Sequence, residues 1–406
     1  MKKNRVLSFL LFIVMTFSFL LSGCFDSDAA KKSADAFCSL VFKSESANLD
    51  KFGVTESKKE ELIETYKSQI KKQLRDNVDR WGGSVSQKQL DDITEAYLET
   101  LSKITFETKQ ISKSGDTAEV EISTTYFDVR STDEQAMISA LDEIENLTFT
   151  SEYEEDKKMA EVYLNKLPDT IRNAEISTEK SKNTFKFVKK DKNWVPEDEE
   201  SFGYMLAMQA TNKDNLNLSI NETRLTSEES AEIFWKLTAK ADVSGFEKLG
   251  YSKEFGERLV QYVKKKLVSE MKDEFASEGA SLSDEEVQKI VTALINALSK
   301  NEAQFEEMSK TNDTAKVKIT STVIDLSTII QSAVEKTTND AIASGNYDLR
   351  KIMEVYCVNC VNEMNNAQPV SKASNEKIFN FTKVADIWLP SNIESFSGGV
   401  GDMCIR

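Results

Sequence analysis

Histidine is absent from this chain of 406 residues. Its absence excludes Ser-His-Asp and Cys-His catalytic arrangements, zinc sites with histidine ligands and histidine general bases. Proline and glycine are also scarce, at 4 and 14 residues, which argues against a low-complexity stalk. The mean hydropathy is −0.43 and no second long apolar run follows the first, so a protein that crosses a membrane several times is excluded.

The N-terminus has the layout of an export signal. Three basic residues within the first five positions precede an apolar run over 6–21, which is short for a transmembrane helix. The run ends in Leu21-Ser22-Gly23-Cys24, which resembles the lipobox of bacterial lipoproteins. The resemblance implies a signal peptide removed before Cys24 and a diacylglyceryl anchor, with acyl chains such as palmitate, on that cysteine. We therefore expect a lipid-anchored protein on the extracytoplasmic face of the cell membrane, in a Gram-positive bacterium.

The expected mature chain is strongly acidic. The full sequence has a formal charge of −16, and residues 1–23 contain three basic and no acidic residues, so the mature charge is −16 − 3 = −19. Such a chain repels nucleic-acid phosphates and anionic lipid headgroups. We expect no nucleic-acid partner, membrane contact through the Cys24 anchor alone, and an unidentified extracellular ligand or envelope protein as partner.

The sequence contains an internal repeat, which we interpret as two diverged copies of one domain. A shift of 197 positions aligns residues 36–128 with 233–325 without a gap, at 26 identities in 93 positions. After this stretch the second copy is shorter by three or four residues, and Trp194-Val195-Pro196 matches Trp388-Leu389-Pro390. Internal repeats of this kind predict a repeated structural unit. The predicted organisation is a signal peptide over 1–23, a lipidated N-terminus over 24–28, modules over 29–205 and 226–400, a linker over 206–225 and a tail over 401–406.

Each module begins with helical patterns. Phe37 and Leu40 mark a first helix, and Ser86-x-x-Gln89 and Ser283-x-x-Glu286 are capping boxes that open a third. Between them, apolar residues at steps of four predict a helix with one core-facing stripe. The stripe consists of Leu62, Tyr66, Ile70, Leu74 and Val78 in the first copy and of Leu259, Val263, Leu267, Met271 and Phe275 in the second.

The pattern then changes to a period of two. Apolar residues alternate with polar ones over 118–124, which predicts a half-buried strand, and 106–113 is its expected hairpin partner. A helical stretch across 133–166 and a last strand over 185–189, just before Trp194, complete the module. Because helices and strands are segregated along the chain, we expect an α+β fold, with a few helices packed on a small antiparallel sheet.

These features together resemble a known family. The lipobox, the helices, the strand Gly115-Asp116-Thr117-Ala118-Glu119-Val120-Glu121-Ile122 and the segment Asp191–Asp198 are similar to Gram-positive surface lipoproteins grouped as domain of unknown function 5105, in two tandem copies. The strand and tryptophan pattern is also similar to cystatin-like and nuclear-transport-factor-like cones, which would imply a curved sheet around a pocket. The family brings no catalytic residues to carry over.

Cys357 and Cys360 form a Cys-x-x-Cys motif, which in an exported protein indicates a redox pair, half of a metal site or a structural disulfide. The first module has Leu164 and Leu167 at the equivalent positions. Cysteines that replace leucines three residues apart on a helix favour buried free thiols that pack as small hydrophobic groups. We therefore expect no metal and no cofactor here.

Trp194 and Trp388 are candidates for stacking on a ligand, although we favour a role in closing the core behind the last strand. The acidic clusters at 152–156 and 198–200 do not match the calcium-loop pattern and indicate a solvated acidic face. Glu119 and Glu121 become Lys316 and Lys318 in the second copy, which indicates either neutral drift or a complementary contact between surfaces.

A non-enzymatic binding module displayed at the cell surface is the function that these observations favour. The alternatives are a membrane-anchored hydrolase that uses carboxylates and a structural protein of envelope assembly. A deep pocket lined by several acids would indicate the enzyme, whereas an exposed apolar patch would indicate a binding protein.

Replacing Cys24 by serine removes the thiol that the expected acylation requires. Metabolic labelling with a fatty acid should mark the wild-type protein and leave the Cys24→Ser variant unlabelled, with both followed by an antibody to the mature chain. Equal labelling of the two proteins would contradict the lipoprotein assignment.

Overall fold

The computed structural model of the chain describes residues 28–46, 48–80, 85–149, 151–211, 225–277, 279–345, 347–370, 374–384 and 387–406. The predicted signal peptide, Cys24 and most of the predicted linker lie outside these ranges. Within them, no helix combines the length and the hydropathy that a crossing of a membrane requires.

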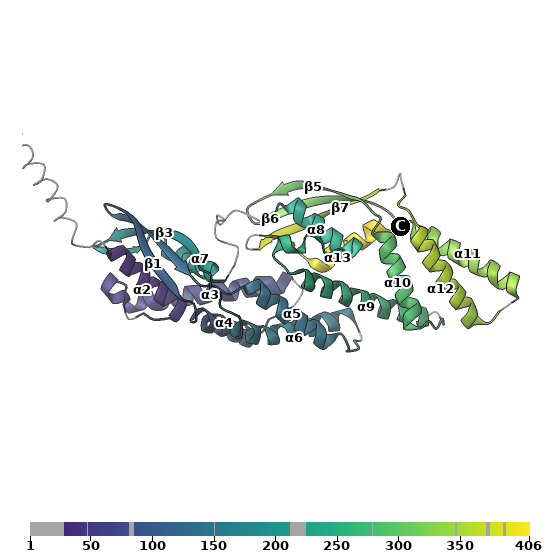
Figure 1. Ribbon diagram of the computed structural model, residues 1–406, viewed down its shortest axis with the longest axis horizontal. Helices are drawn as coiled ribbons and strands as arrows, with labels where there is room; N and C mark the ends of the chain where they lie inside the picture. Colours follow the sequence, from purple (N-terminus) through teal and green to yellow (C-terminus); the bar gives the residue numbers. More distant parts are fainter. Residues whose placement is uncertain are drawn as a thin grey trace, which may run out of the picture. The chain divides into compact units, whose positions relative to one another are not determined.

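The same order of elements occurs twice along the chain (Figure 1). The first series is α2 (Ala29–Lys43), η1 (Leu49–Phe52), α3 (Glu56–Arg80), α4 (Gln87–Leu101), β1 (Phe106–Ser114), β2 (Thr117–Thr124), α5 (Val129–Ile144), α6 (Glu152–Arg172), β3 (Ser181–Lys190), β4 (Asn193–Pro196) and α7 (Glu199–Thr211). The second series is α8 (Ser227–Lys240), η2 (Phe246–Leu249), α9 (Lys253–Ser277), α10 (Asp284–Leu298), β5 (Ala303–Lys310), β6 (Thr314–Thr322), α11 (Leu326–Ser344), α12 (Leu349–Asn366), β7 (Ser374–Val384), β8 (Ile387–Pro390) and α13 (Ile393–Cys404).

Two antiparallel sheets of four strands confirm the predicted α+β class. Their orders are β1-β2-β3-β4 and β5-β6-β7-β8. Each first hairpin has a register shift at the same place, between Gln110 and Ser112 in one and between Glu307 and Ser309 in the other. A register shift of this kind adds one residue to one strand, which bends that strand and increases its twist. Because both hairpins have the shift at the same place, they share this local distortion.

Alternation along the second strand of each sheet places its apolar side chains in a core beneath helices. Val120 and Ile122 are fully buried under α2 and α7, and Val317 and Ile319 occupy the same positions in the other sheet. Three phenylalanine rings of the last long strand and the final helix pack together in each case, edge to face in three of the four ring pairs and tilted in the pair Phe379–Phe396. They are Phe185, Phe187 and Phe202 in the first series and Phe379, Phe381 and Phe396 in the second.

The charge reversal between the two sheets is matched on the neighbouring strand. Glu121 lies opposite Lys109, whereas Lys318 lies opposite Glu306 and forms an ion pair with it at 2.5 Å. Opposite charges directly across a strand pair stabilise it, and like charges destabilise it. The reversal at Glu121 and Lys318 is thus accommodated within each sheet, whereas Glu119 and Lys316 lie opposite Ser112 and Ser309 on the neighbouring strands.

Contacts divide the chain into two compact units that do not follow the order of the series. Among the described residues, the first unit contains those within 28–74, 87–129 and 171–211, and the second contains 75–80 and 85–86 with those within 130–170 and 225–406. The hairpin of α5 and α6 therefore belongs, by its contacts, to the unit that holds the whole second series. The internal repeat did not predict this division. A repeat in the sequence shows which elements occur twice, but it does not show which elements are in contact.

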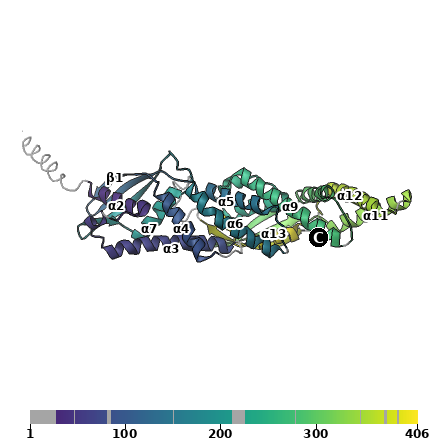
Figure 2. The same cartoon turned by 90° about the horizontal axis from the view of Figure 1, so that it is seen from below.

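Apolar side chains of α5 and α6 pack on α8, η2 and α9 within the second unit. Figure 2 shows α5, α6 and α9 next to one another. Met137 and Leu141 of α5 share one buried cluster with Ile233, Phe246 and Phe255. A second cluster around Ala140, Ile144 and Val162 is covered by the ring of Tyr262 from α9. Burial of each such side chain contributes roughly 1.5–3 kcal/mol, so these clusters dominate the attachment of the hairpin.

Polar contacts surround these apolar clusters. The Glu134 carboxylate accepts hydrogen bonds from the backbone N–H and the hydroxyl of Ser252, at 2.7 and 2.6 Å, where α9 begins. An acid at a helix N-terminus is also favoured by the helix dipole. Arg258 donates to Asp142 at 2.7 Å and to Glu145, and its hydrogen bond lowers the pKa of Glu145.

Several boundaries differ from those predicted. The helical stretch expected across 133–166 is the pair α5 and α6 and extends beyond both predicted ends, and α7 continues to Thr211 because Leu206 and Ala210 are buried in the core. The stripe of α9 does not face a single core. A step of four residues advances about 40° beyond a full turn, so the stripe drifts around the helix. Leu259 packs with the α5–α6 cluster, Val263 is exposed, and Leu267 packs with the separate cluster of α10, α11 and α12.

A glycine at the start of α9 allows Arg130 to approach the backbone. Gly250 has φ +83°, and a Cβ there would lie 1.8 Å from Nη1 of Arg130. Gly279 has φ +82° with open space around it, which makes it a matched control. We expect Gly279→Ala to cost roughly 1 kcal/mol of stability from backbone strain alone, and Gly250→Ala to cost at least about 1 kcal/mol more from the clash. Thermal and denaturant unfolding would measure both, and equal losses would contradict the packing of Arg130 on this glycine.

Candidate functional site

The two motif cysteines lie in an apolar core. Cys357 and Cys360 of α12 are buried, free thiols that pack with Val287 and Ile290 of α10 and with Met364. Burial raises the pKa of Cys357 to about 11, with a further contribution from the charge of Glu286, and burial also raises the pKa of Cys360. Thiols in this state are neutral at physiological pH and react slowly.

Both tryptophans are buried in the cores beneath the sheets, and neither is placed to stack on a ligand. Trp194 and Trp388 are each 1 % exposed. Each tryptophan lies in a short fourth strand, β4 or β8, which pairs with the long strand before it. The strand predicted as the last one of each module is therefore followed by one more. Lys113 and Lys310 lie over the two rings at 5.4 and 5.3 Å, a cation–π contact that both sheets share.

Acidic residues do not gather into a site among the residues that the structure describes. No group of three or more cysteine, aspartate or glutamate side chains is arranged there to hold a metal ion. Asp198 instead accepts hydrogen bonds from the backbone and hydroxyl of Ser201, at the start of α7.

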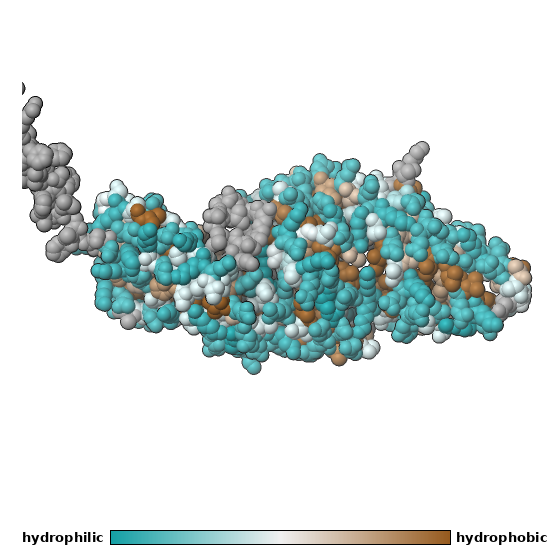
Figure 3. All heavy atoms as spheres, viewed as in Figure 1, coloured by the Kyte–Doolittle hydropathy of each residue, from teal (hydrophilic) through white to brown (hydrophobic). Residues whose placement is uncertain are grey.

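An exposed apolar surface lies on the hairpin of α11 and α12, which we call the distal hairpin. Figure 3 shows apolar residues gathered over the region where Figure 1 places these helices. The exposed apolar side chains are Ile330, Val334, Ile342, Leu349, Val355 and Val358. Exposed apolar side chains scattered singly are ordinary, whereas a group of them on one pair of helices indicates an interaction surface.

A groove runs between the two helices of the distal hairpin, with an open volume of about 490 Å³. Its floor is made of small and aliphatic residues such as Ala341, Ala343 and Ile352, and Asp340 and Lys351 bring opposite charges to it. The first series has Ile144 where the groove has Ala341, and Leu147 where it has Ser344. Smaller side chains on α11 therefore open the groove.

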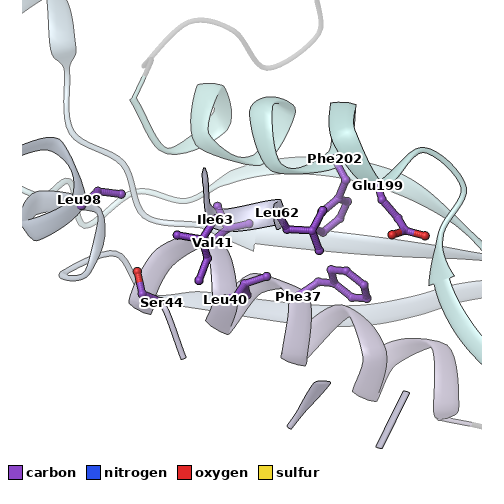
Figure 4. A pocket seen from close by; sticks show the side chains of 9 residues that line it. All are labelled: Phe37, Leu40, Val41, Ser44, Leu62, Ile63, Leu98, Glu199 and Phe202. Atoms are coloured by element: carbon purple, nitrogen blue, oxygen red, sulfur yellow. The ribbon is translucent and has the colours of Figure 1, made fainter. Parts of the chain in front are cut away.

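A second, smaller groove lies in the first unit, among α2, α3, α4 and α7 (Figure 4). Its volume is about 30 Å³. Phe37 and Leu40 of α2 point toward Leu62 of α3 and Phe202 of α7, and Glu199 is the one acid in the lining. Helices alone line it, so it is not the pocket inside a curved sheet that a cone-like fold would provide.

Comparison with known proteins gives one family and one solved structure. The model of the family "Domain of unknown function (DUF5105)" matches residues 26–207. The matched residues include the first series from α2 into α7. A search of curated proteins finds no match. The crystal structure of a "putative lipoprotein (ycdA)" from Bacillus subtilis is similar at 13 % identity and a TM-score of 0.39, over 75 % of this chain and 95 % of that one.

The match ends inside α7, and the second series repeats the order of elements and the sheet order of the first. The distal hairpin thus corresponds to α5 and α6 of the matched region. Sequence analysis did not find this surface, because the stripe on α11 has the pattern of a core-facing helix. Met137 and Leu141 of the first series are replaced by Val334 and Thr338 in the second. This replacement indicates an exposed face on α11 only when the contacts of α5 are already known.

Burial of the motif thiols makes a direct prediction. In the native, reduced protein Cys357 and Cys360 should react slowly with a maleimide at pH 7–8, and unfolding should release them for rapid labelling. Replacing both by alanine should cost modest stability, on the order of 1–3 kcal/mol, because two small buried groups are lost. Rapid labelling of the native protein, or a metal bound at the pair, would instead identify them as a functional site.

Proposed function

We propose that this chain is a non-enzymatic binding protein, held by a lipid on Cys24 at the extracytoplasmic face of the cell membrane, which recruits a protein partner through the distal hairpin. The observation that carries the proposal is the exposed apolar surface of α11 and α12 with its open groove. The lipobox supports the anchor.

A protein partner fits this surface better than a small molecule does. Small-molecule sites enclose most of the ligand, whereas this groove is open along the helices and has exposed aliphatic side chains beside it. Paired helices with an apolar seam favour docking of another helix, whose side chains enter the groove at intervals of three and four residues. Asp340 and Lys351 would fix the orientation of such a helix, since they offer opposite charges.

A carboxylate-based hydrolase has less support. Hydrolysis of a glycoside by two carboxylates needs the pair on either side of one scissile bond. Each of the two grooves contains a single acid, Asp340 in the distal hairpin and Glu199 in the first unit.

The proposal predicts a selective contact at the distal hairpin in cells. A photo-crosslinking amino acid at Ile342, which is 63 % exposed, should give a protein adduct with the anchored, full-length chain. Ile378 on β7, at 53 % exposure, provides a matched aliphatic control away from the hairpin. Adducts from Ile342 and not from Ile378 are expected. Equal adducts from both positions, or none from Ile342, would argue against the hairpin as a docking surface.

A further inference from the structure

The hairpin of α5 and α6 and the distal hairpin correspond position by position. A polar contact between the two helices occurs at the same place in both. Lys166 pairs with Glu143 at 2.8 Å in the first hairpin, and Asn359 donates a hydrogen bond to Asp340 at 3.2 Å in the second. The offset is 340 − 143 = 197 positions for the first helix and 359 − 166 = 193 positions for the second, so the connection between the helices of the distal hairpin is four residues shorter.

The groove of the distal hairpin is the counterpart of a filled site in the first hairpin. Four of the residues that line the groove correspond to members of one apolar cluster of α5 and α6. The corresponding pairs are Thr337 with Ala140, Ala341 with Ile144, Ile352 with Met159, and Val355 with Val162. The same positions therefore form a closed cluster in one hairpin and an open groove in the other.

An aromatic side chain from another element closes the site in the first hairpin. The ring of Tyr262 in α9 packs on the cluster, and its hydroxyl donates a hydrogen bond to Glu155 of α6. Lys266, one turn later on α9, pairs with the same carboxylate at 3.1 Å. A second ring, that of Phe149 in the connection between α5 and α6, also packs on the cluster. The site thus accepts aromatic rings, one of which is carried on a helix outside the hairpin.

No aromatic ring occupies the groove of the distal hairpin among the residues that the structure describes. None of the residues that line the groove is aromatic. Tyr347, in the shorter connection, is 73 % exposed and is not part of the lining. Ala341 and Ser344 replace the larger Ile144 and Leu147, and the open volume is about 490 Å³. The groove therefore has both the apolar positions and the room that an aromatic side chain requires.

We propose that this groove receives an aromatic side chain carried on a helix of the partner protein, as the hairpin of α5 and α6 receives Tyr262. This inference rests on the proposed function, and it names the group by which the distal hairpin recognises its partner. An aromatic ring buries a large apolar area and has few rotatable bonds, so its immobilisation in such a groove costs little conformational entropy.

Charge at the groove indicates what accompanies the ring. In the first hairpin the carboxylate of Glu143 is paired with the ammonium of Lys166, whereas the neutral amide of Asn359 contacts Asp340 in the second. This contact leaves the negative charge of Asp340 at the groove. A carboxylate can accept several hydrogen bonds, so Asp340 suits a tyrosine hydroxyl or a basic residue one turn from the ring. Lys351, the one base in the lining, suits an acid farther along the same helix.

Two variants separate filling of the groove from a general change of α11. Ala341→Ile restores the residue of the first hairpin and fills part of the groove. Asn339→Ile adds the same side chain at an exposed position of α11 that does not line the groove, which makes it the matched control. Both are made in the chain from residue 24 onward with Cys24→Ser, so that no acyl chain can enter the groove. If Ala341→Ile lowers the unfolding temperature, Ser344→Leu, at an exposed position of the lining, replaces it.

The probe is p-cresol, which is the side chain of tyrosine without its backbone. In NMR spectra of the methyl-labelled chain, p-cresol should shift the methyl resonances of Ile352 and Val355 in a saturable way, because an aromatic ring displaces the resonances of groups that it packs on. The methyl groups of Ile378, on β7, should not respond. Ala341→Ile should weaken binding of p-cresol at least about tenfold, and Asn339→Ile should leave it unchanged. Isoamyl alcohol should bind at least about fivefold more weakly than p-cresol, because its chain is flexible and offers less contact area.

The absence of saturable shifts at Ile352 and Val355 would overturn the inference. Equal affinity for isoamyl alcohol, or undiminished binding of p-cresol by Ala341→Ile, would also overturn it.

Crosslinking in cells distinguishes this inference from the proposed function. With the photo-crosslinking residue at position 342, Ala341→Ile should reduce the protein adduct at least about tenfold and Asn339→Ile should not, because the partner's ring loses its site. An adduct that persists undiminished in Ala341→Ile would overturn the aromatic recognition and leave the proposed docking surface standing. Loss of the adduct in the parent chain would instead remove the proposed function itself.

Discussion

The docking of α5 and α6 on α8, η2 and α9 is the contact on which the organisation of this chain depends. It buries Met137 and Leu141 with Phe246 and Phe255, and it places Glu134 over the start of α9. Through this contact the second unit contains a hairpin that the sequence assigns to the first module. The second unit therefore contains two helical hairpins, and α9 contributes to the clusters of both, through Leu259 in one and Leu267 in the other.

Much of the fold could be predicted from local patterns. The alternation around Val120, the capping box of Ser283 and Glu286, and the repeated identities gave the class, the strand pairing and the order of elements. Element boundaries failed where burial overrides composition, as in the last turns of α7. The division into units could not be predicted, because the contacts of α5 and α6 with α8, η2 and α9 join positions about 100 residues apart whose side chains are ordinary core residues.

The candidate site was harder to predict than the fold. Cys357, Cys360, Trp194 and Trp388 were singled out because their residue types are rare and chemically distinctive, yet all four are buried. The distal hairpin consists of common aliphatic residues, and neither composition nor spacing separates Val334 from the core residue Ala333 next to it. Only the position of each side chain relative to its neighbours distinguishes a surface that binds from one that packs.

The hairpin of α5 and α6 packs on the elements that follow it, whereas the equivalent face of the distal hairpin is exposed. Repeat proteins ordinarily protect such faces with polar capping units. Here the polar Thr338 replaces Leu141, but Val334 and Ile342 are aliphatic and are 48 % and 63 % exposed. Ile342 occupies the position of Glu145 in the first series, so an aliphatic side chain has replaced an acid at an exposed position. Aliphatic side chains at these positions, beside a groove lined by Ala341 and Ser344, are the opposite of a polar cap and support the proposed docking role of the distal hairpin.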